Sequence, residues 1–309
     1  MLTLFLAAAV VAGTPLLFAI IGEIITEKSG KLNLGVEGMM LMGAVIGFKV
    51  GLATANPYLS IIAAMVSGAF GASIFAFLTI TLRANQVVAG LSLTIFGTGF
   101  SSFLGQGLMG EVISDSMKKF FVEIHLPILG QIPFIGEIFF RQGIFVYIGY
   151  VLAILTGIYL YRTRAGLNLL AVGENTAAAD AAGIRVSLYQ YIHTLAGGAF
   201  CGLGGAYLSL VYIPSWQENV SAGRGWIAVA LVIFSKWSPY RAIYAAFLFG
   251  GLDIIGFRLQ KFDIHFSQYI IDMLPYVFTT LVLILVSIRE SKENAPPAEL
   301  GNPYFREER

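Results

Sequence analysis

Nine apolar stretches, seven of them about long enough to cross a lipid bilayer as a helix, constrain this chain more than any other feature of its sequence. Crossing the hydrocarbon core takes about 20 helical residues, and a backbone in lipid must satisfy its own hydrogen bonds. The stretches are approximately residues 3–21, 35–53, 58–82, 87–104, 143–161, 191–213, 222–235, 242–257 and 269–288. We predict an all-α, polytopic membrane protein of about nine transmembrane or re-entrant helices, and the short seventh and eighth are the candidates for a broken or re-entrant helix.

The composition supports this fold class and narrows the function. Only 12% of the 309 residues are charged and 57% are hydrophobic, whereas about 25% of a soluble domain is charged. The net charge of +1 gives no reason to expect a nucleic-acid partner. Residues 1–288 are expected to form a single transmembrane domain in the lipid bilayer, and the polar, proline-containing residues 289–309 to form a disordered cytoplasmic tail.

A polar segment at residues 162–190 separates the fifth apolar stretch from the sixth, and it sets the orientation that we predict. Lysine and arginine are enriched on the cytoplasmic side of membrane proteins. With residues 162–190 in the cytoplasm, twelve of the 19 lysine and arginine residues lie in cytoplasmic segments. This orientation places the N-terminus outside and the C-terminus in the cytoplasm.

The same segment contains a run of alanines that is expected to form a short helix over residues 177–182. Asn175 or Thr176 can cap its start, Gly183 suits the position after its end, and Asp180 lies near its positive N-terminus. Such a helix is too short to be stable alone, and its small side chains would let another protein approach the backbone. We predict that the segment docks a soluble partner; the alternative is an ordinary loop between two helices. The residues expected at the contact are Gly173, Glu174, Asn175, Ala178, Asp180 and Gly183.

Polar residues in the second and fourth apolar stretches are candidates for a solute path. An ionisable group at membrane depth is costly unless it faces protein or water, and a row of polar side chains suits an uncharged polyhydroxyl solute. The candidates are Asn33, Glu37, Asn85, Gln86, Ser92 and Thr94. Two alternatives remain open. The hydroxyls could form hydrogen bonds between helices, and Glu37 could accept hydrogen bonds from the backbone of a broken helix, which we favour.

Arg224 opens the seventh stretch and needs a partner or a route to water. It could extend its side chain to the membrane surface, or it could pair with Asp253 or Asp272 on the next two stretches. Trp216 and Trp226 flank the same region and suit the aromatic belt at the membrane surface.

Several enzyme classes and cofactors are excluded by missing residues. A phosphate-binding loop needs Gly-x-x-x-x-Gly-Lys-Ser/Thr, and the nearest approach, residues 25–32, lacks the first Gly and ends in Leu32. The chain is therefore not expected to bind ATP itself. The single cysteine, Cys201, allows no internal disulfide, and the three histidines have no metal-ligand spacing. We expect no catalytic site, metal or cofactor.

Four segments together resemble one family of membrane proteins. They are Leu32 to Ala44, Leu82 to Gly99, Ala165 to Ile184 and Ser221 to Pro239. In this order they resemble the permease subunits of bacterial ABC importers for ribose and other simple sugars, nucleosides and branched-chain amino acids. Within that family the chain is most similar to the nucleoside and simple-sugar branch, especially the second of two paired permeases. The resemblance covers nearly the whole chain except the tail.

The resemblance implies a multi-pass protein of the bacterial plasma (inner) membrane. It implies three partners: a cytoplasmic ABC ATPase, a second homologous permease, and an extracytoplasmic substrate-binding lipoprotein. In the family, the segment that matches Ala165 to Ile184 holds the coupling helix that contacts the ATPase. Relatives often have Pro where this chain has Thr176, which can cap the helix instead. The alternatives are a branched-chain amino acid permease, or a secondary transporter or channel that uses Glu37, Asp253 and Asp272 without an ATPase.

Overall fold

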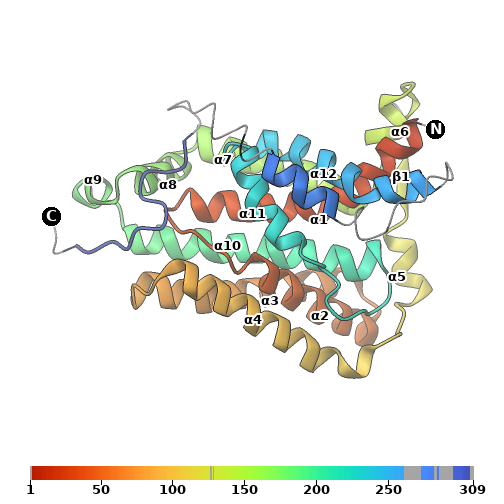
Figure 1. The fold of residues 1–309 in the computed structure, drawn as a ribbon, viewed down its shortest axis with the longest axis horizontal. Helices are drawn as coiled ribbons and strands as arrows, with labels where there is room; N and C mark the ends of the chain where they lie inside the picture. Colours follow the sequence, from red (N-terminus) through yellow and green to blue (C-terminus); the bar gives the residue numbers. More distant parts are fainter. Residues whose placement is uncertain are drawn as a thin grey trace.

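The computed structural model describes residues 2–125, 127, 129–260, 273–281, 284 and 295–306 of the chain. Long helices dominate these residues (Figure 1). They are α1 (Leu2–Glu27), α2 (Val36–Thr54), α3 (Pro57–Ala76), α4 (Gln86–Gly105), α7 (Ile144–Arg162), α10 (Val186–Tyr207) and α12 (Pro239–Gln260). α3 and α10 continue as the π-helices η1 (Phe77–Thr81) and η4 (Leu208–Tyr212), and α4 continues as the 3₁₀-helix η2 (Gln106–Leu108).

Shorter elements connect the long helices. Between α4 and α7 lie α5 (Asp115–Phe120), β1 (Glu123–His125), η3 (Leu129–Gln131), α6 (Ile135–Phe139) and β2 (Arg141–Gly143). β1 and β2 pair antiparallel, with Glu123 opposite Gly143. Between α7 and α10 lie α8 (Arg164–Glu174) and α9 (Thr176–Ala181), and α11 (Arg224–Phe234) precedes α12.

Six helical segments of the described residues are long and apolar enough to cross a membrane. They are Leu2–Glu27, Val36–Thr54, Pro57–Thr81, Gln86–Leu108, Ile144–Arg162 and Val186–Tyr212. The first six predicted stretches are therefore confirmed as candidate spans. The seventh contains only α11, which at 11 residues is about 16 Å long and too short to cross. The eighth lies within α12, a continuous helix of 22 residues, so the expectation of a short or broken helix there was wrong. The ninth lies mostly outside the described residues, and its described part, 273–281, is helical.

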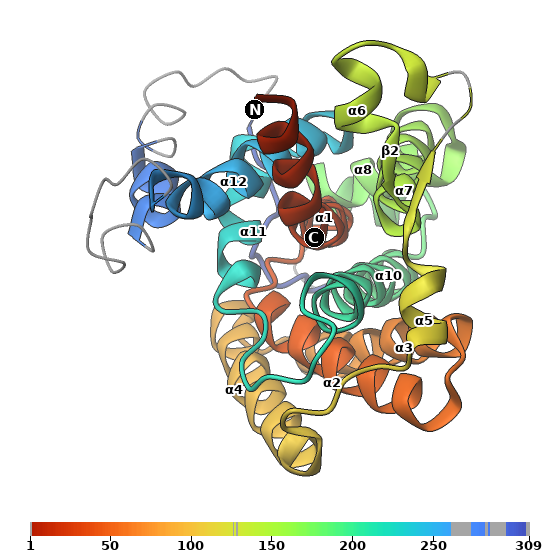
Figure 2. The same cartoon turned by 90° about the vertical axis from the view of Figure 1, so that its right-hand side faces the viewer.

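The helices run side by side around α1 and α10 (Figures 1 and 2). α2, α3 and α4 form a layer on one side of α10, α7 lies on the other side, and α11 and α12 flank α1. Helices in a membrane approach closely where residues are small. A Cβ atom added to Gly202 of α10 would collide with the Ala64 carbonyl of α3, so this contact requires glycine.

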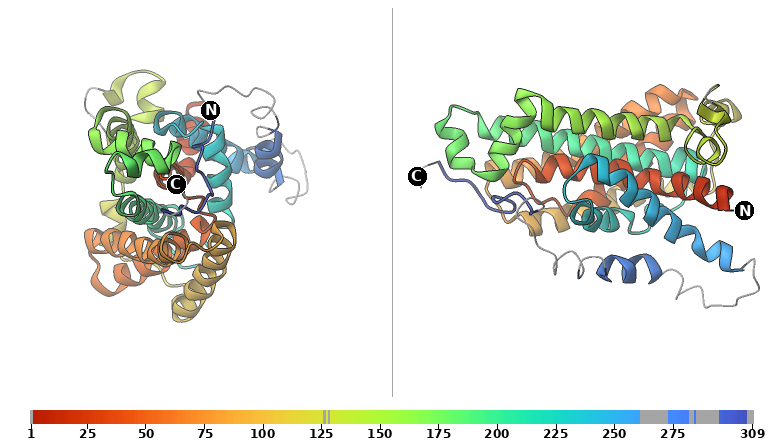
Figure 3. Two further views of the ribbon diagram at one scale, coloured as in Figure 1. Left: turned by 90° about the vertical axis from the view of Figure 1, so that its left-hand side faces the viewer. Right: turned by 90° about the horizontal axis from the view of Figure 1, so that it is seen from above.

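The two ends of the bundle carry different structures. α8, α9 and the C-terminal tail lie at one end, whereas the N-terminus, α5, α6 and the small sheet lie at the other (Figures 1 and 3). The α11–α12 turn is also at the α8 end, because the Tyr161 hydroxyl near the end of α7 donates to the Trp237 carbonyl at 3.4 Å. Segments that the sequence assigns to one side of the membrane therefore gather at one end.

The tail differs from its expected disorder where the structure describes it. Residues 295–306 lie across the end of the bundle that carries α8 (Figure 3). The Glu299 amide donates to the Gly173 carbonyl at 3.0 Å, and the Gly301 amide donates to the Gly30 carbonyl at 3.2 Å. The tail thus joins the α1–α2 connection to α8. Its polar, proline-containing composition predicted disorder, and composition does not reveal the backbone contacts that hold it.

Candidate functional site

The connection between α10 and α11 interrupts the helices inside the protein. The π-helix η4 ends at Tyr212, and α11 begins only at Arg224. Asn219, Ala222 and Gly223 have φ angles of 53°, 47° and 82°, a left-handed region that non-glycine residues seldom adopt. These residues turn the chain sharply and leave the N-terminus of α11 within the bundle. We call residues 213–223 the break.

Glu37 closes the break from the side of α2. Its Oε1 accepts hydrogen bonds from the Ser221 hydroxyl at 2.5 Å and the Gly223 amide at 2.9 Å, and its Oε2 accepts from the Gly225 amide at 2.6 Å. The side chain is buried. A carboxylate at this place satisfies amides that a helix start leaves unpaired and complements the positive helix end. The geometry supports the structural interpretation of Glu37 that the sequence favoured.

Arg224 forms an ion pair instead of extending to the membrane surface. Its Nη2 lies 2.6 Å from Oδ2 of Asp253, and the exposed fractions of the two side chains are 13% and 32%. The guanidinium also lies 5.5 Å from the centre of the Tyr212 ring. Of the two acids considered from the sequence, Asp253 is the partner shown, and Asp272 lies outside the described residues.

Trp216 is not part of an aromatic belt. It is 2% exposed and packs against Phe48, with 5.8 Å between the ring centres. Trp226 is 37% exposed, as a belt residue would be. Trp216 therefore anchors the beginning of the break to α2, and the sequence-based expectation for it was wrong because an amphipathic ring also suits a buried position.

α4 borders the break on its other side. The Ser102 hydroxyl donates to the Glu218 carboxylate at 2.7 Å; Glu218 is exposed and Ser102 is half-buried. The Thr94 hydroxyl donates to the Leu34 carbonyl at 3.0 Å, whereas Ser92 lies on the exposed face of α4. α4 thus offers hydroxyl groups both to the protein interior and to its outer face.

Two other path candidates, Asn33 and Gln86, fix the backbone between α1 and α2. This connection enters the bundle before α2 begins, and most of its residues are buried. Gln86 accepts a hydrogen bond from the Leu32 amide at 2.7 Å, and Asn33 accepts from the amide two residues on at 2.9 Å. Asn85 is exposed and caps α4 by accepting from the Val88 amide at 3.1 Å. Asn33, Gln86 and Thr94 therefore meet around one connection, and Asn85 and Ser92 lie away from it.

The alanine helix predicted in the polar segment is present as α9. The Asn175 side chain accepts from the Ala178 amide at 2.9 Å, which confirms the predicted cap. At the other end Gly183 has φ of 83°, and its amide donates to the Asp180 carbonyl at 3.0 Å. The following amide, of Ile184, donates to the Ala179 carbonyl at 3.0 Å, which completes a Schellman motif.

One face of α9 is packed and the other is bare. Ala179 packs with Val172 of α8 and Val186 of α10 in a small apolar cluster. The exposed residues at and around the helix are Glu174, Asn175, Ala177, Ala178, Ala181, Ala182 and Gly183. Gly173 lies beneath them, where a Cβ atom would collide with the Lys28 carbonyl. The exposed face of α9 therefore consists mainly of small side chains, and Gly173 packs closely beneath it.

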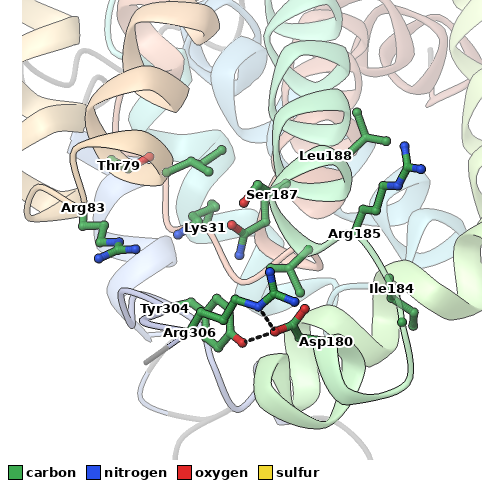
Figure 4. A pocket seen from close by; sticks show the side chains of 14 residues that line it. Lys31, Thr79, Arg83, Asp180, Ile184, Arg185, Ser187, Leu188, Tyr304 and Arg306 are labelled. Atoms are coloured by element: carbon green, nitrogen blue, oxygen red, sulfur yellow. Dashed lines mark hydrogen bonds and ion pairs between the residues drawn. The ribbon is translucent and has the colours of Figure 1, made fainter. Parts of the chain in front are cut away.

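Asp180 has a different environment from the other predicted contact residues. The Tyr304 hydroxyl donates to its carboxylate at 2.7 Å, and Nε of Arg306 lies 3.2 Å from the same oxygen (Figure 4). The Asp180 side chain is 13% exposed. It therefore holds the tail against α9, a contact between residues more than 120 positions apart that no local sequence pattern indicates.

Sequence reasoning also missed a buried polar group at the end of α1. The first apolar stretch was predicted to end at residue 21, but α1 continues to Glu27. The Trp237 indole donates to Glu27, and Glu23 accepts from the Asn33 amide at 3.0 Å. The two glutamates, four residues apart on one face of a helix, were the available signal. Among the described side chains no three His, Cys, Asp or Glu residues gather as a metal site would require.

Comparisons with known proteins assign the family. The family model for the branched-chain amino acid transport system, permease component, matches residues 5–287. The chain belongs to this family. It is a multi-pass permease component of the cell (inner) membrane, a class of transport protein rather than an enzyme. No solved structure matches the chain.

Two named relatives cover nearly the whole chain, and a third covers most of it. The putative glucose ABC transporter permease protein TsgC13 of Haloferax volcanii is 38% identical over 98% of this chain and 97% of its own length. The guanosine ABC transporter permease protein NupQ of Bacillus subtilis is 34% identical over 100% of this chain and 98% of its own length. A second guanosine permease of Bacillus subtilis, NupP, is 25% identical over 78% of this chain and 70% of its own length.

Proposed function

We propose that this chain is one of two permease subunits of an ABC importer for a nucleoside or a simple sugar. Separate cytoplasmic ATPase subunits drive transport, and an extracytoplasmic lipoprotein delivers the solute. The observation that carries the proposal is the full-length similarity to permeases named for glucose and for guanosine. Both solutes are uncharged and carry several hydroxyl groups.

The solute path runs, in this proposal, along α4 and past the break. Interrupted helices in transporters place backbone groups and helix ends where a solute can reach them. The half-buried Ser102 and the exposed Glu218 can donate to and accept from sugar hydroxyls, and Ser92 lies farther along the outer face of α4. Asn33, Gln86, Thr94 and Glu37 shape this path by fixing the backbone on either side of it. Asn85 acts at the start of α4.

The second permease faces the outer side of α4. Large apolar side chains there are exposed, including Ile95 at 75% and Phe103 at 72%. Such a surface fits lipid or another apolar helix. Bacillus subtilis has two guanosine permeases that match this chain with different identities, and this supports a heterodimer of homologous permeases rather than two identical subunits.

Coupling takes place through α9. With the N-terminus outside and the C-terminus in the cytoplasm, α8, α9 and the tail meet the ATPase. The exposed face around Glu174, Asn175, Ala178 and Gly183 fits a groove, because its small side chains keep the backbone accessible. Closure of the ATPase subunits on ATP then shifts the permease pair between outward-open and inward-open states.

Uptake measurements test the substrate class. A strain that lacks only this gene should lose uptake of labelled nucleoside or of labelled glucose, and the gene on a plasmid should restore it. Loss of leucine uptake alone would instead support a branched-chain amino acid permease, which the family description names. Copurification tests the transport class. The tagged chain should bring an ABC ATPase with it, whereas a secondary transporter or channel would be isolated without one.

A further inference from the structure

A positively charged cavity lies between the tail and the bundle. It has a volume of about 550 Å³ and is bordered by η1, the α9–α10 turn and the tail (Figure 4). Four basic residues line it, namely Lys31, Arg83, Arg185 and Arg306, together with one acid, Asp180. Arg306 already pairs with Asp180 at 3.2 Å. Among the described lining residues, the basic side chains therefore outnumber the acidic ones by four to one.

Lys31 is the most unusual of these residues. It is 1% exposed, and in the part of the chain that the structure describes its ammonium has no ion pair or side-chain hydrogen bond. In Figure 4 the ammonium points toward the side of the cavity where Arg83 lies. Burial lowers the pKa of Lys31 to about 8, so below that pH the cavity contains a buried cation. Such a charge is costly unless an anion compensates it.

Arg83 lies on the same side of the cavity and comes from a different element. It follows η1 with φ of 57°, and its guanidinium stacks on the Phe305 ring of the tail at 4.6 Å. Stacking leaves the edge of a guanidinium free to donate several hydrogen bonds in one plane, the geometry that suits a phosphate. The hydroxyls of Ser187 and Tyr304 also line the cavity.

We propose that this cavity binds a phosphate group, with Lys31 and Arg83 as its ligands. The cavity lies where the spans Pro57–Thr81 and Val186–Tyr212 end and begin, at the depth of lipid headgroups. Basic pockets in this place suit anionic headgroups. The same chemistry would bind the phosphate of a soluble metabolite. This site goes beyond the proposed function, because the proposed solutes are uncharged and their path lies along α4.

The amine reactivity of Lys31 tests the proposal directly. The full-length chain, with any subunits that copurify, is treated with formaldehyde and cyanoborohydride, and methylation of Lys31 is measured by peptide mass spectrometry. One series adds inorganic phosphate to protein in phosphatidylcholine vesicles. The other increases the phosphatidylglycerol content of those vesicles without free phosphate. Lys28, three residues earlier and outside the cavity lining, serves as the internal control.

We expect Lys31 but not Lys28 to become protected in at least one series. Protection by phosphatidylglycerol alone identifies a lipid headgroup, protection by inorganic phosphate alone identifies a soluble phosphate compound, and either result supports the site. Arg83→Gln should raise the half-protecting concentration about tenfold, since a charge-assisted hydrogen bond contributes on the order of 1.5 kcal/mol or more. Arg83→Lys should retain most of the protection.

Arg164→Gln is the matched control variant, because Arg164 is an exposed arginine at the same end but does not line the cavity. It should leave the protection of Lys31 unchanged. The proposal is overturned if neither inorganic phosphate nor phosphatidylglycerol protects Lys31, if Arg83→Gln and Arg164→Gln behave alike, or if Lys31 is not methylated even without phosphate. A lack of methylation without phosphate would mean that the Lys31 amine cannot be reached from the cavity.

Discussion

At the scale of single residues, Glu37 shows how one side chain can hold a discontinuous membrane helix. A helix start leaves amides without partners, and inside a membrane protein water does not replace them. The two oxygens of Glu37 accept three hydrogen bonds from the residues around the start of α11. Both oxygens are thereby occupied by the protein's own chain, so the carboxylate shapes the break more than it offers a free ligand group.

Glu37→Gln should destabilise the protein. The amide nitrogen of glutamine would face an amide donor at Gly223 or Gly225, so one donor loses its acceptor, and an unsatisfied buried group costs about 1–3 kcal/mol. The midpoint of thermal unfolding in detergent should fall, and uptake should fall with it. Glu111→Gln, at an exposed position, is the control and should leave the midpoint unchanged. An unaltered midpoint for Glu37→Gln would show that the break does not depend on the carboxylate.

The Arg224–Asp253 pair supports a second residue-scale prediction. Asp253→Asn leaves a largely buried guanidinium without its countercharge, which we expect to destabilise the protein by about 1–3 kcal/mol after allowance for partial exposure. Removing both charges, with Arg224→Gln and Asp253→Asn together, should recover part of this loss, because no unpaired charge remains. A double-mutant cycle of unfolding midpoints measures the difference. Strict additivity of the two changes would mean that the ion pair contributes nothing.

At the scale of elements, α9 is a six-residue helix that cannot be stable alone. It persists because Asn175 caps its start, Gly183 ends it in a left-handed conformation, and Ala179 packs into a small apolar cluster. The sequence carries both end signals, and this is why the helix could be predicted within one residue at each end. The tail contact at Asp180 adds a fourth restraint from a distant part of the chain.

Gly183→Ala should reduce coupling without preventing insertion. At φ of 83° a Cβ atom costs about 1–2 kcal/mol, although no neighbouring atom lies within 4 Å of its position. The strain should loosen the C-terminal end of α9, which transmits motion from the ATPase in our proposal. Uptake per ATP hydrolysed should therefore fall by about fivefold, which is at the low end of typical allosteric coupling. Gly110→Ala is the matched control, because Gly110 has φ of 79° and equally open surroundings at the other end of the bundle. Equal effects of the two substitutions would contradict a coupling role.

Asp180→Asn tests the restraint that the tail applies. Asparagine can still accept from Tyr304, but it loses the ion pair with Arg306, which contributes about 0–1 kcal/mol because the arginine is exposed. The unfolding midpoint should therefore hardly change, whereas ATP hydrolysis should become less dependent on transported solute. Asp115→Asn removes a comparable exposed ion pair, with Lys118, at the other end and should change neither. ATPase assays in vesicles with and without solute distinguish the two variants.

At the scale of the whole molecule, the apolar stretches predicted the fold class and six candidate spans, because helix length in a bilayer is read from sequence alone. The short length of the seventh apolar stretch indicated an interrupted helix, but it did not predict the geometry of the break. The hydrogen-bond donors of Glu37 and the ion-pair partners of Arg224 and Asp180 lie between 29 and 188 residues away, so no local pattern contains them. Composition likewise indicated a disordered tail and could not show that its backbone meets Gly30 and Gly173.

Placing the molecule in the membrane is the prediction on which the coupling proposal depends. The two ends of the bundle are structurally distinct (Figure 1), and we expect the α9 end to face the cytoplasm. The chain offers a clean experiment, since Cys201 is its single cysteine and is fully buried. In a Cys201→Ser background, Ala178→Cys and Ser116→Cys each place one exposed thiol at opposite ends.

A membrane-impermeant maleimide should label Ser116→Cys in intact cells, and it should label Ala178→Cys only after the cells are permeabilised. The wild-type protein, with its buried cysteine, should remain unlabelled under both conditions. Labelling of the wild-type protein would indicate general unfolding. Labelling of Ala178→Cys in intact cells would place α9 outside, where no ATPase could reach it. In that case the small-residue face of α9 would have to meet an extracytoplasmic partner, and the positively charged cavity beside it would lie at the outer surface.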